Sequence, residues 1–310
     1  MRRELRGILL TVAAAVVIVW LGTHMSDYHQ LQGAGVATFF VAILGLNLLT
    51  GYTGQISLGH GAFMMIGGYT TAILNSRHGW SVISTMPIAA LVAFGVGVLV
   101  GIPALRLSGA YLALATFAVA LVVPALALKY DHFTGGRQGI LLPFRSGHWL
   151  YVTAWSVAAI SLVLAWLIVR GRTGRTFRAI RDSEVAAMSS GISLHVYKTL
   201  AFGISAAFAG AAGSLFVIEN NFAQPDEFSL FLSIQLLIGV AVGGLGALSG
   251  VIFGALFIEL LPIWAQNVSQ QAPAVIQGLA VILAMFLLPG GVAGLFRRLG
   301  ALTTRVRRAS

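Results

Sequence analysis

Hydrophobic runs recur along the whole chain and are separated by short polar segments. The runs are long enough, or extendable enough through their flanks, to approach the ~20 apolar residues that a membrane-spanning helix needs. They cover residues 7–22, 33–50, 61–74, 85–105, 109–128, 150–169, 199–218, 230–242, 251–264 and 272–288. This pattern predicts an all-α polytopic membrane protein with about ten transmembrane segments.

Composition supports the same class of protein. Mean hydropathy is +0.90 and only 9% of the residues are charged, far below the roughly 25% of an ordinary soluble domain. The first run follows Arg2, Arg3 and Arg6 but ends without a small-x-small cleavage pattern, so we expect an uncleaved first helix rather than a signal peptide.

The net charge of +10 does not indicate a nucleic-acid partner, because the cations flank the hydrophobic runs. They gather at residues 2–6, 170–181 and 297–308, and the positive-inside rule then predicts that both termini and the 171–198 connection are cytoplasmic. The predicted organisation is six transmembrane segments in residues 1–170, a cytoplasmic loop at 171–198, four segments in 199–290 and a basic tail at 291–310. Arg77 and the 129–147 connection are exceptions, since they place positive charge on the predicted external side.

The most unusual local sequence is GYTGQISLGHGAF at residues 51–63. Non-helical chain at membrane depth persists only where it is buried in protein or lines a watery cavity, and glycine permits the necessary turns. One interpretation is therefore a broken helix on the translocation path, carried by Gly51, Gly54, Gln55, Ser57 and His60. The alternative is an ordinary cytoplasmic hairpin loop followed by a packing face of small residues.

A second interruption, GGLGALSG at residues 243–250, repeats this spacing in Gly243, Gly246 and Ser249. Paired glycine-interrupted segments in the two halves of a transporter indicate a binding or transport path. The interruptions follow the second and eighth runs, which do not correspond in a simple five-plus-five repeat. We assign all three residues to the predicted path or broken helix.

Two buried polar candidates and one packing stripe lie within the runs. Glu259 either belongs to the path or bonds to a neighbouring helix, and we favour the second interpretation. For Asn47, interhelical hydrogen bonding is the expected role. The seventh run carries small residues that predict close helix packing in the bundle core: Gly203, Ala207, Gly210 and Gly213.

The sequence of the 171–198 connection predicts one amphipathic helix, which begins at Thr176 and ends before Gly191. It could be a basic surface helix bound to anionic lipid. The alternative is a protruding surface of small side chains that docks into a groove on a partner. We favour it because small residues follow Glu184, namely Ala186, Ala187 and Gly191.

Several segments together resemble a known family: GLNLLTGYTGQISLGHGAFMMIGGY, RLSGAYLALATFA, TGGRQGI, RAIRDSEVAAMSSGISLHVYKTLAFGISAAFAGAAGSL and GGLGALSG. In this order they resemble the permease subunit of branched-chain amino-acid ABC importers, the LivM-like type. The resemblance extends from about Arg2 to Arg297.

The resemblance implies a non-catalytic permease in the bacterial cytoplasmic (inner) membrane. Its implied partners are a LivH-like second permease, two ABC ATPase subunits that bind ATP-Mg, and an extracytoplasmic solute-binding protein. The EAA-type coupling loop of such importers falls on Glu184, Ala186, Ala187 and Gly191. Implied substrates are branched-chain amino acids or related small polar or amphipathic solutes.

This chain itself is expected to bind no cofactor or metal. Neither of its two lysines stands in a phosphate-binding loop pattern, and the histidines show no metal-ligand spacing. An intramembrane enzyme is disfavoured for the same reason. The remaining alternative is an ion-coupled secondary transporter or channel that works without ATPase subunits.

Overall fold

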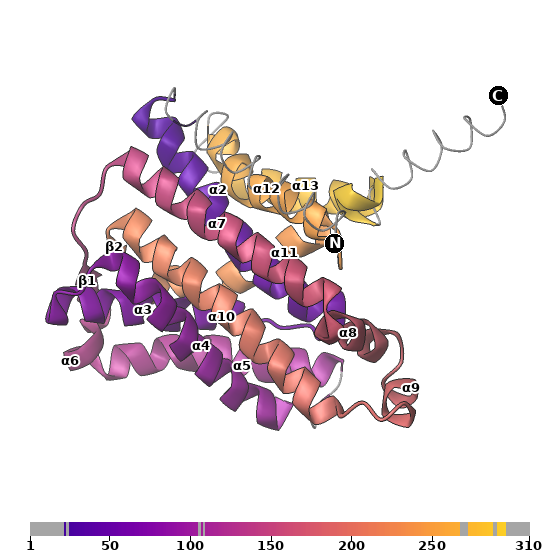
Figure 1. The fold of residues 1–310 in the computed structure, drawn as a ribbon. Helices are drawn as coiled ribbons and strands as arrows, with labels where there is room; N and C mark the ends of the chain where they lie inside the picture. Colours follow the sequence, from indigo (N-terminus) through magenta and orange to yellow (C-terminus); the bar gives the residue numbers. More distant parts are fainter. Residues whose placement is uncertain are drawn as a thin grey trace, which may run out of the picture.

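The computed structural model describes residues 22, 25–104, 107, 109–266, 272–287 and 290–295, which form a helical bundle (Figure 1). The main helices are α2 (Asp27–Leu46), α3 (His60–His78), α4 (Val82–Ala104), α5 (Ala110–Lys129), α7 (Gly147–Arg170), α10 (Leu194–Asn220), α11 (Leu230–Gly243), α12 (Val251–Gln266) and α13 (Ala272–Leu287). Each of these coincides with a predicted hydrophobic run. The first run and most of the basic tail lie outside the described residues.

Shorter elements join these helices. They are the π-helical turn η1 (Asn47–Gly51), α6 (Asp131–Thr134), α8 (Arg172–Asp182), α9 (Glu184–Ser189), the 3-10 turns η2 (Gly136–Gln138), η3 (Pro225–Phe228) and η4 (Leu248–Gly250), and the strands β1 (Ile140–Leu141) and β2 (Phe222–Ala223).

Within the described residues, six helical segments are long and apolar enough to cross a membrane. They cover residues 27–51, 82–103, 110–129, 147–170, 194–220 and 248–266. The helix α11 is apolar but too short to qualify, with 14 residues. The fold is therefore that of an all-α multi-pass membrane protein, whereas the total of ten spans and the orientation of the termini remain predictions.

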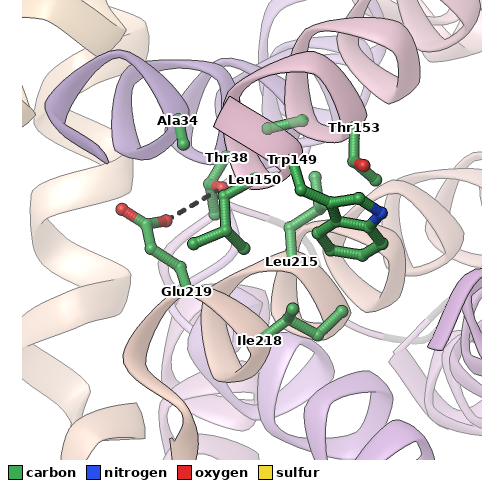
Figure 2. Close-up of a pocket in the computed structure, with 9 residues that line it drawn as sticks. Ala34, Thr38, Trp149, Leu150, Thr153, Leu215, Ile218 and Glu219 are labelled. Atoms are coloured by element: carbon green, nitrogen blue, oxygen red, sulfur yellow. Dashed lines mark hydrogen bonds between the residues drawn. The ribbon is translucent and has the colours of Figure 1, made fainter. Parts of the chain in front are cut away.

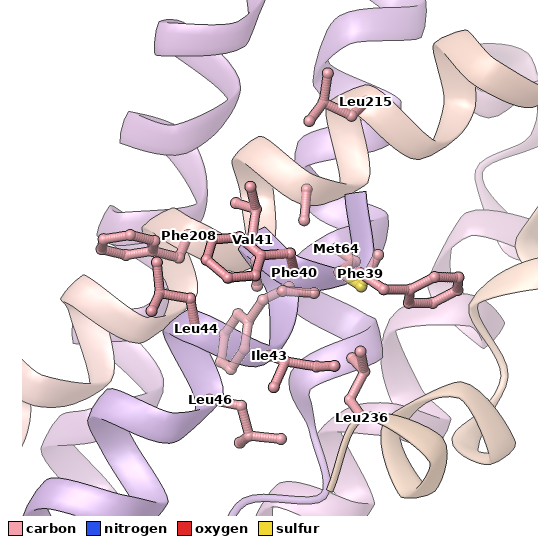
Figure 3. Packing of buried hydrophobic residues seen from close by; sticks show 14 of the residues in the cluster. Phe39, Phe40, Val41, Ile43, Leu44, Leu46, Met64, Phe208, Leu215 and Leu236 are labelled. Carbon is pink, nitrogen blue, oxygen red and sulfur yellow. The ribbon is translucent and has the colours of Figure 1, made fainter. Parts of the chain in front are cut away.

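The most buried helix is α2, which lies at the centre and packs against α7, α10 and α12. Its side chains Phe40, Ile43 and Leu44 interdigitate with Phe208 of α10 and Leu236 of α11 (Figure 3). Lipid tails are as apolar as these residues, so close van der Waals packing rather than escape from water holds such helices together.

Small residues bring α10 against α3 and α4. A methyl group on Gly213 would overlap the carbonyl of Met64, and Gly67 meets the backbone of Gly210 in the same way. The predicted packing stripe of α10 is thus confirmed at Gly210 and Gly213, where no side chain fits between the two helices.

The two ends of the bundle differ. At one end β1 pairs antiparallel with β2, Ile140 opposite Ala223, and at the other end α8 and α9 form a helical loop (Figure 1). The unexpected cation Arg77 lies at the β1–β2 end, where its guanidinium contacts the His132 carbonyl and lies 5.6 Å from the centre of the Phe133 ring. Arg77 is therefore held by local contacts with the connection after α5.

Candidate functional site

The first glycine-rich interruption is a true break in helical structure. Helix α2 passes through η1, and the chain is then non-helical from Gly54 to Gly59. The next helix, α3, begins at His60, whose Nε2 donates a hydrogen bond to the Ala42 carbonyl at 3.2 Å. Ala42 lies roughly 13 Å before the end of η1 at 1.5 Å per residue. Helix α3 therefore begins alongside the interior of the 27–51 span.

Side chains from other helices satisfy two of the amides at this break. Thr116 of α5 accepts a hydrogen bond from the Leu58 amide at 2.9 Å. Ser233 of α11 accepts one from the Gly61 amide, also at 2.9 Å, in the first turn of α3. Because an unpaired backbone group is costly in an apolar environment, these two hydroxyls make the break tolerable at this depth.

The polar residues predicted from this segment are buried in the protein. Ser57 accepts from the Gly59 amide at 3.3 Å, and Gln55 donates through Nε2 to the Thr53 hydroxyl at 2.8 Å. His60 is fully buried, and its Nδ1 has no hydrogen-bond partner among the described residues. Within this chain these side chains support the break itself, and their place on a transport path stays a prediction.

The second interruption meets the first one. A methyl group on Gly51 would overlap the Gly246 amide, so the two backbones are in direct contact. Asn47 holds them together, since its Oδ1 accepts from the Gly246 amide at 2.9 Å and its Nδ2 donates to the Ala247 carbonyl at 3.1 Å. We call this group, Asn47, Gly51, Gly54, Gly246 and Ala247, the glycine junction.

The repeated spacing of the two interruptions does not give equivalent serines. Ser57 is fully buried, whereas Ser249 is exposed and lines a surface hollow of about 200 Å³ together with Phe40 and Trp166. Gly243 contacts the backbone of Gly250, so the first and last residues of the second interruption touch each other. Both glycines assigned from the second motif, Gly243 and Gly246, thus have a packing reason to lack side chains.

The 171–198 connection contains two helices, so the prediction of a single helix starting at Thr176 is wrong. Thr176 lies inside α8 and donates its hydroxyl proton to the Arg172 carbonyl. Ser183 ends α8 and caps α9, accepting from the Ala186 amide at 3.2 Å. A serine that bonds to an amide three residues on starts a new helix, and this local cap divides the loop.

Helix α9 ends at Ser189, and Gly191 follows its C-cap as predicted, with φ of +79°. The Gly191 amide donates to Met188 and the Ile192 amide to Ala187, the paired bonds of a glycine-terminated helix. At the other end of α9, Glu184 forms an ion pair of 2.7 Å with Lys198 of α10, whose side chain is only 7% exposed. The short helix is therefore held at both ends.

The exposed surface of α9 differs from the protruding surface predicted from the sequence. Ala187 is only 3% exposed and faces inward, so it cannot itself touch a partner. Glu184, Ala186 and Gly191 are exposed, and the apolar side chains Val185 and Met188 are 69% and 52% exposed. The exposed face of α9 is thus apolar at its centre, at Val185 and Met188, and the Glu184 carboxylate lies beside it.

Glu259 faces a second carboxylate. A methyl group on Gly35 of α2 would lie 2.5 Å from Glu259 Oε1 and 2.9 Å from Glu219 Oε1, so both side chains converge on one point. The Thr38 hydroxyl donates to Glu219 at 3.3 Å beside a cavity of about 10 Å³, enough for one water molecule (Figure 2). The sequence placed Glu219 in a connection, but it lies in the last turn of α10.

These features define a multi-pass helical membrane protein with two interrupted segments that meet and a helical loop at one end. The chain belongs to the family described as branched-chain amino acid transport system, permease component, which matches residues 32–290. The high-affinity branched-chain amino acid permease protein LivM of Escherichia coli (strain K12) is 33% identical, over 89% of this chain and 73% of that relative.

Two further relatives show the range of the similarity. The LivH permease protein of the same E. coli system is 22% identical over 83% of this chain and 92% of LivH. The galactofuranose transporter permease protein YtfT of E. coli is 29% identical over 68% of this chain and 62% of YtfT. No solved structure gives a significant match to this chain.

Proposed function

We propose that this chain is the transmembrane permease subunit of an ABC importer for branched-chain amino acids or related small solutes. The family and the LivM relative support the substrate class. The similarity to a galactofuranose permease shows that related chains serve other cargo, so selection of the solute is proposed to rest with a separate extracytoplasmic binding protein.

The observation that carries this proposal is the exposed face of α9. Val185 and Met188 leave apolar surface unburied on a helix that the Glu184–Lys198 ion pair and a glycine cap hold in place. A rigid helix with apolar anchors suits docking into a groove of a partner. The proposed partners are two cytoplasmic ABC ATPase subunits, one docked on this chain and the other on a LivH-like permease, each binding ATP-Mg.

In the proposed mechanism, ATP binding closes the two ATPases and displaces α9. The permease pair then opens to opposite sides of the bacterial inner membrane in turn, and the solute passes between the two permeases. The segments Gly51–His60 and Gly243–Ser249 are proposed to border that passage. This chain performs no covalent chemistry in the cycle.

The test is co-purification of the chain with its ATPases. Val185→Asp places a charge at the apolar centre of α9, and Phe144→Asp makes the same kind of change at an 81% exposed position near the β1–β2 end. We expect Val185→Asp to lose the ATPase while Phe144→Asp retains it. If no ATPase ever co-purifies with the wild type and the chain alone moves leucine into liposomes, the ion-coupled transporter replaces this proposal.

A further inference from the structure

One side chain of the α8–α9 loop reaches the glycine junction. Arg181 stands in the last turn of α8, and its Nη1 donates a 3.0 Å hydrogen bond to the Gly51 carbonyl. Its aliphatic stem lies over Gly54, where a Cβ would be 3.2 Å from Arg181 Cγ. A Cβ on Gly246 would be 3.1 Å from Arg181 Nη1. Arg181 therefore occupies the corner between the two interruptions.

The Gly51 carbonyl is available to Arg181 because the helix breaks there. The Gly54 amide donates to Thr50 and the Gln55 amide to Leu49, so neither of these amides turns to Gly51. A carbonyl at the end of a helix needs a partner from outside the helix. The guanidinium supplies that partner and brings a charge, which makes the bond stronger than one between neutral groups.

The other side of the same guanidinium is fixed to the loop. Arg181 Nε and Nη2 donate to Asp182 Oδ1 at 3.2 and 3.1 Å. Asp182 ends α8, and Ser183, the N-cap of α9, follows it directly. The buried residues Phe177 and Ile180 seat α8 against the bundle, so the loop and the arginine form one packed unit.

We infer that Arg181 is the positioning residue that transmits movement of the α8–α9 loop to the glycine junction. This inference rests on the proposed function and names the contact through which a docked ATPase acts on the interrupted segments. Asn47 joins those segments to each other, so a pull on Gly51 also moves Gly246 and Ala247. Arg181 acts by way of the backbone and needs no contact with solute.

The test measures exposure of the junction in the assembled complex. The chain has no cysteine. Leu245→Cys, at a 55% exposed position beside Gly246, therefore gives a single labelling site on this chain. In the chain that keeps Arg181, we expect the rate of thiol labelling at this cysteine to change when ATP binds to the complex. We expect the change to disappear in Arg181→Met, with ATP hydrolysis retained and leucine uptake per ATP falling about tenfold, within the usual range of coupling between sites.

Arg175→Gln is the matched control, because Arg175 lies on the same helix and its Nη1 reaches only the Arg170 carbonyl at 3.4 Å. It should behave as the wild type. If Arg181→Met fails to assemble, Asp182→Ala removes the oxygen that accepts from Arg181 Nε and Nη2 and should reduce the labelling response. A full ATP response in either variant, or a proportional loss of hydrolysis and uptake, overturns the inference. If no ATPase binds to the wild-type chain, the proposed function is overturned instead.

Discussion

Asn47 and Gly246 lie 199 residues apart in the chain and are joined by a 2.9 Å hydrogen bond from the Gly246 amide to Asn47 Oδ1. The same amide side chain donates to the neighbouring Ala247 carbonyl. One side chain thus satisfies a donor and an acceptor of a non-helical segment, and it does so from a π-helical turn. Such turns are rare and frequently mark functional sites.

Asn47→Asp tests whether both bonds are needed. Aspartate still accepts from Gly246, but as a carboxylate it cannot donate to Ala247 and would repel that carbonyl. We expect a loss of about 1–3 kcal/mol in unfolding free energy, measured by thermal unfolding of the purified complex, together with reduced uptake. Asn47→Ala should be similarly destabilised. A variant as stable as the wild type would show that the two hydrogen bonds of Asn47 contribute no stability.

Gly51→Ala tests the backbone contact within the glycine junction. The added methyl group would overlap the Gly246 amide, so the two segments must separate. Overpacking of this kind costs about 1–3 kcal/mol. The control is Gly95→Ala in α4, where nothing lies within 4 Å of an added Cβ, and alanine there should stabilise the helix. Equal behaviour of the two variants in melting and uptake would contradict a tight junction.

The Glu184–Lys198 ion pair predicts unequal effects of removing its two partners. Lys198 is nearly buried, whereas the Glu184 side chain is 46% exposed. Glu184→Gln leaves a buried ammonium without its counter-charge, while Lys198→Met removes that ammonium altogether. We expect Glu184→Gln to lower the melting temperature and ATPase retention more than Lys198→Met does. The double variant should resemble Lys198→Met, and a double variant as poor as Glu184→Gln would contradict this account.

The convergence of Glu219 and Glu259 on Gly35 predicts that one carboxylate can be neutralised without harm. Like charges at close range disfavour each other, so Glu259→Gln keeps the size of the side chain and relieves that conflict. We expect the variant to melt at or above the wild-type temperature. A clear fall in melting temperature would instead show that both carboxylates together hold a favourable partner such as a cation.

The sequence predicted the positions of most helices and both interruptions, because hydrophobic runs and glycine spacing are local signals. It could not predict that Gly51 meets Gly246, since spacing carries no information on tertiary pairing. Asn47 was expected to bond between helices, and the bond exists, but its partner is a non-helical segment.

Errors in the loop have a similar cause. The sequence predicted one helix from Thr176, whereas the cap at Ser183 starts a separate helix at Glu184, and the packing of that helix decides which of its side chains face outward. The exposed face of α9 therefore presents Val185 and Met188, while Ala187 packs inward. The contact of Arg181 with Gly51 could not be predicted for another reason, because Arg181 stands among several arginines that the positive-inside rule already explained.

The contact between Gly51 and Gly246 also constrains how this chain can change over generations. Neither residue has a side chain to shrink, so a larger residue at one position cannot be compensated by a smaller residue at the other. Revertants of a Gly51 lesion should therefore carry either the original glycine or a second-site change that moves the backbone, for example at Asn47 or Arg181. Selection for such suppressors would map, residue by residue, what holds the two interrupted segments together.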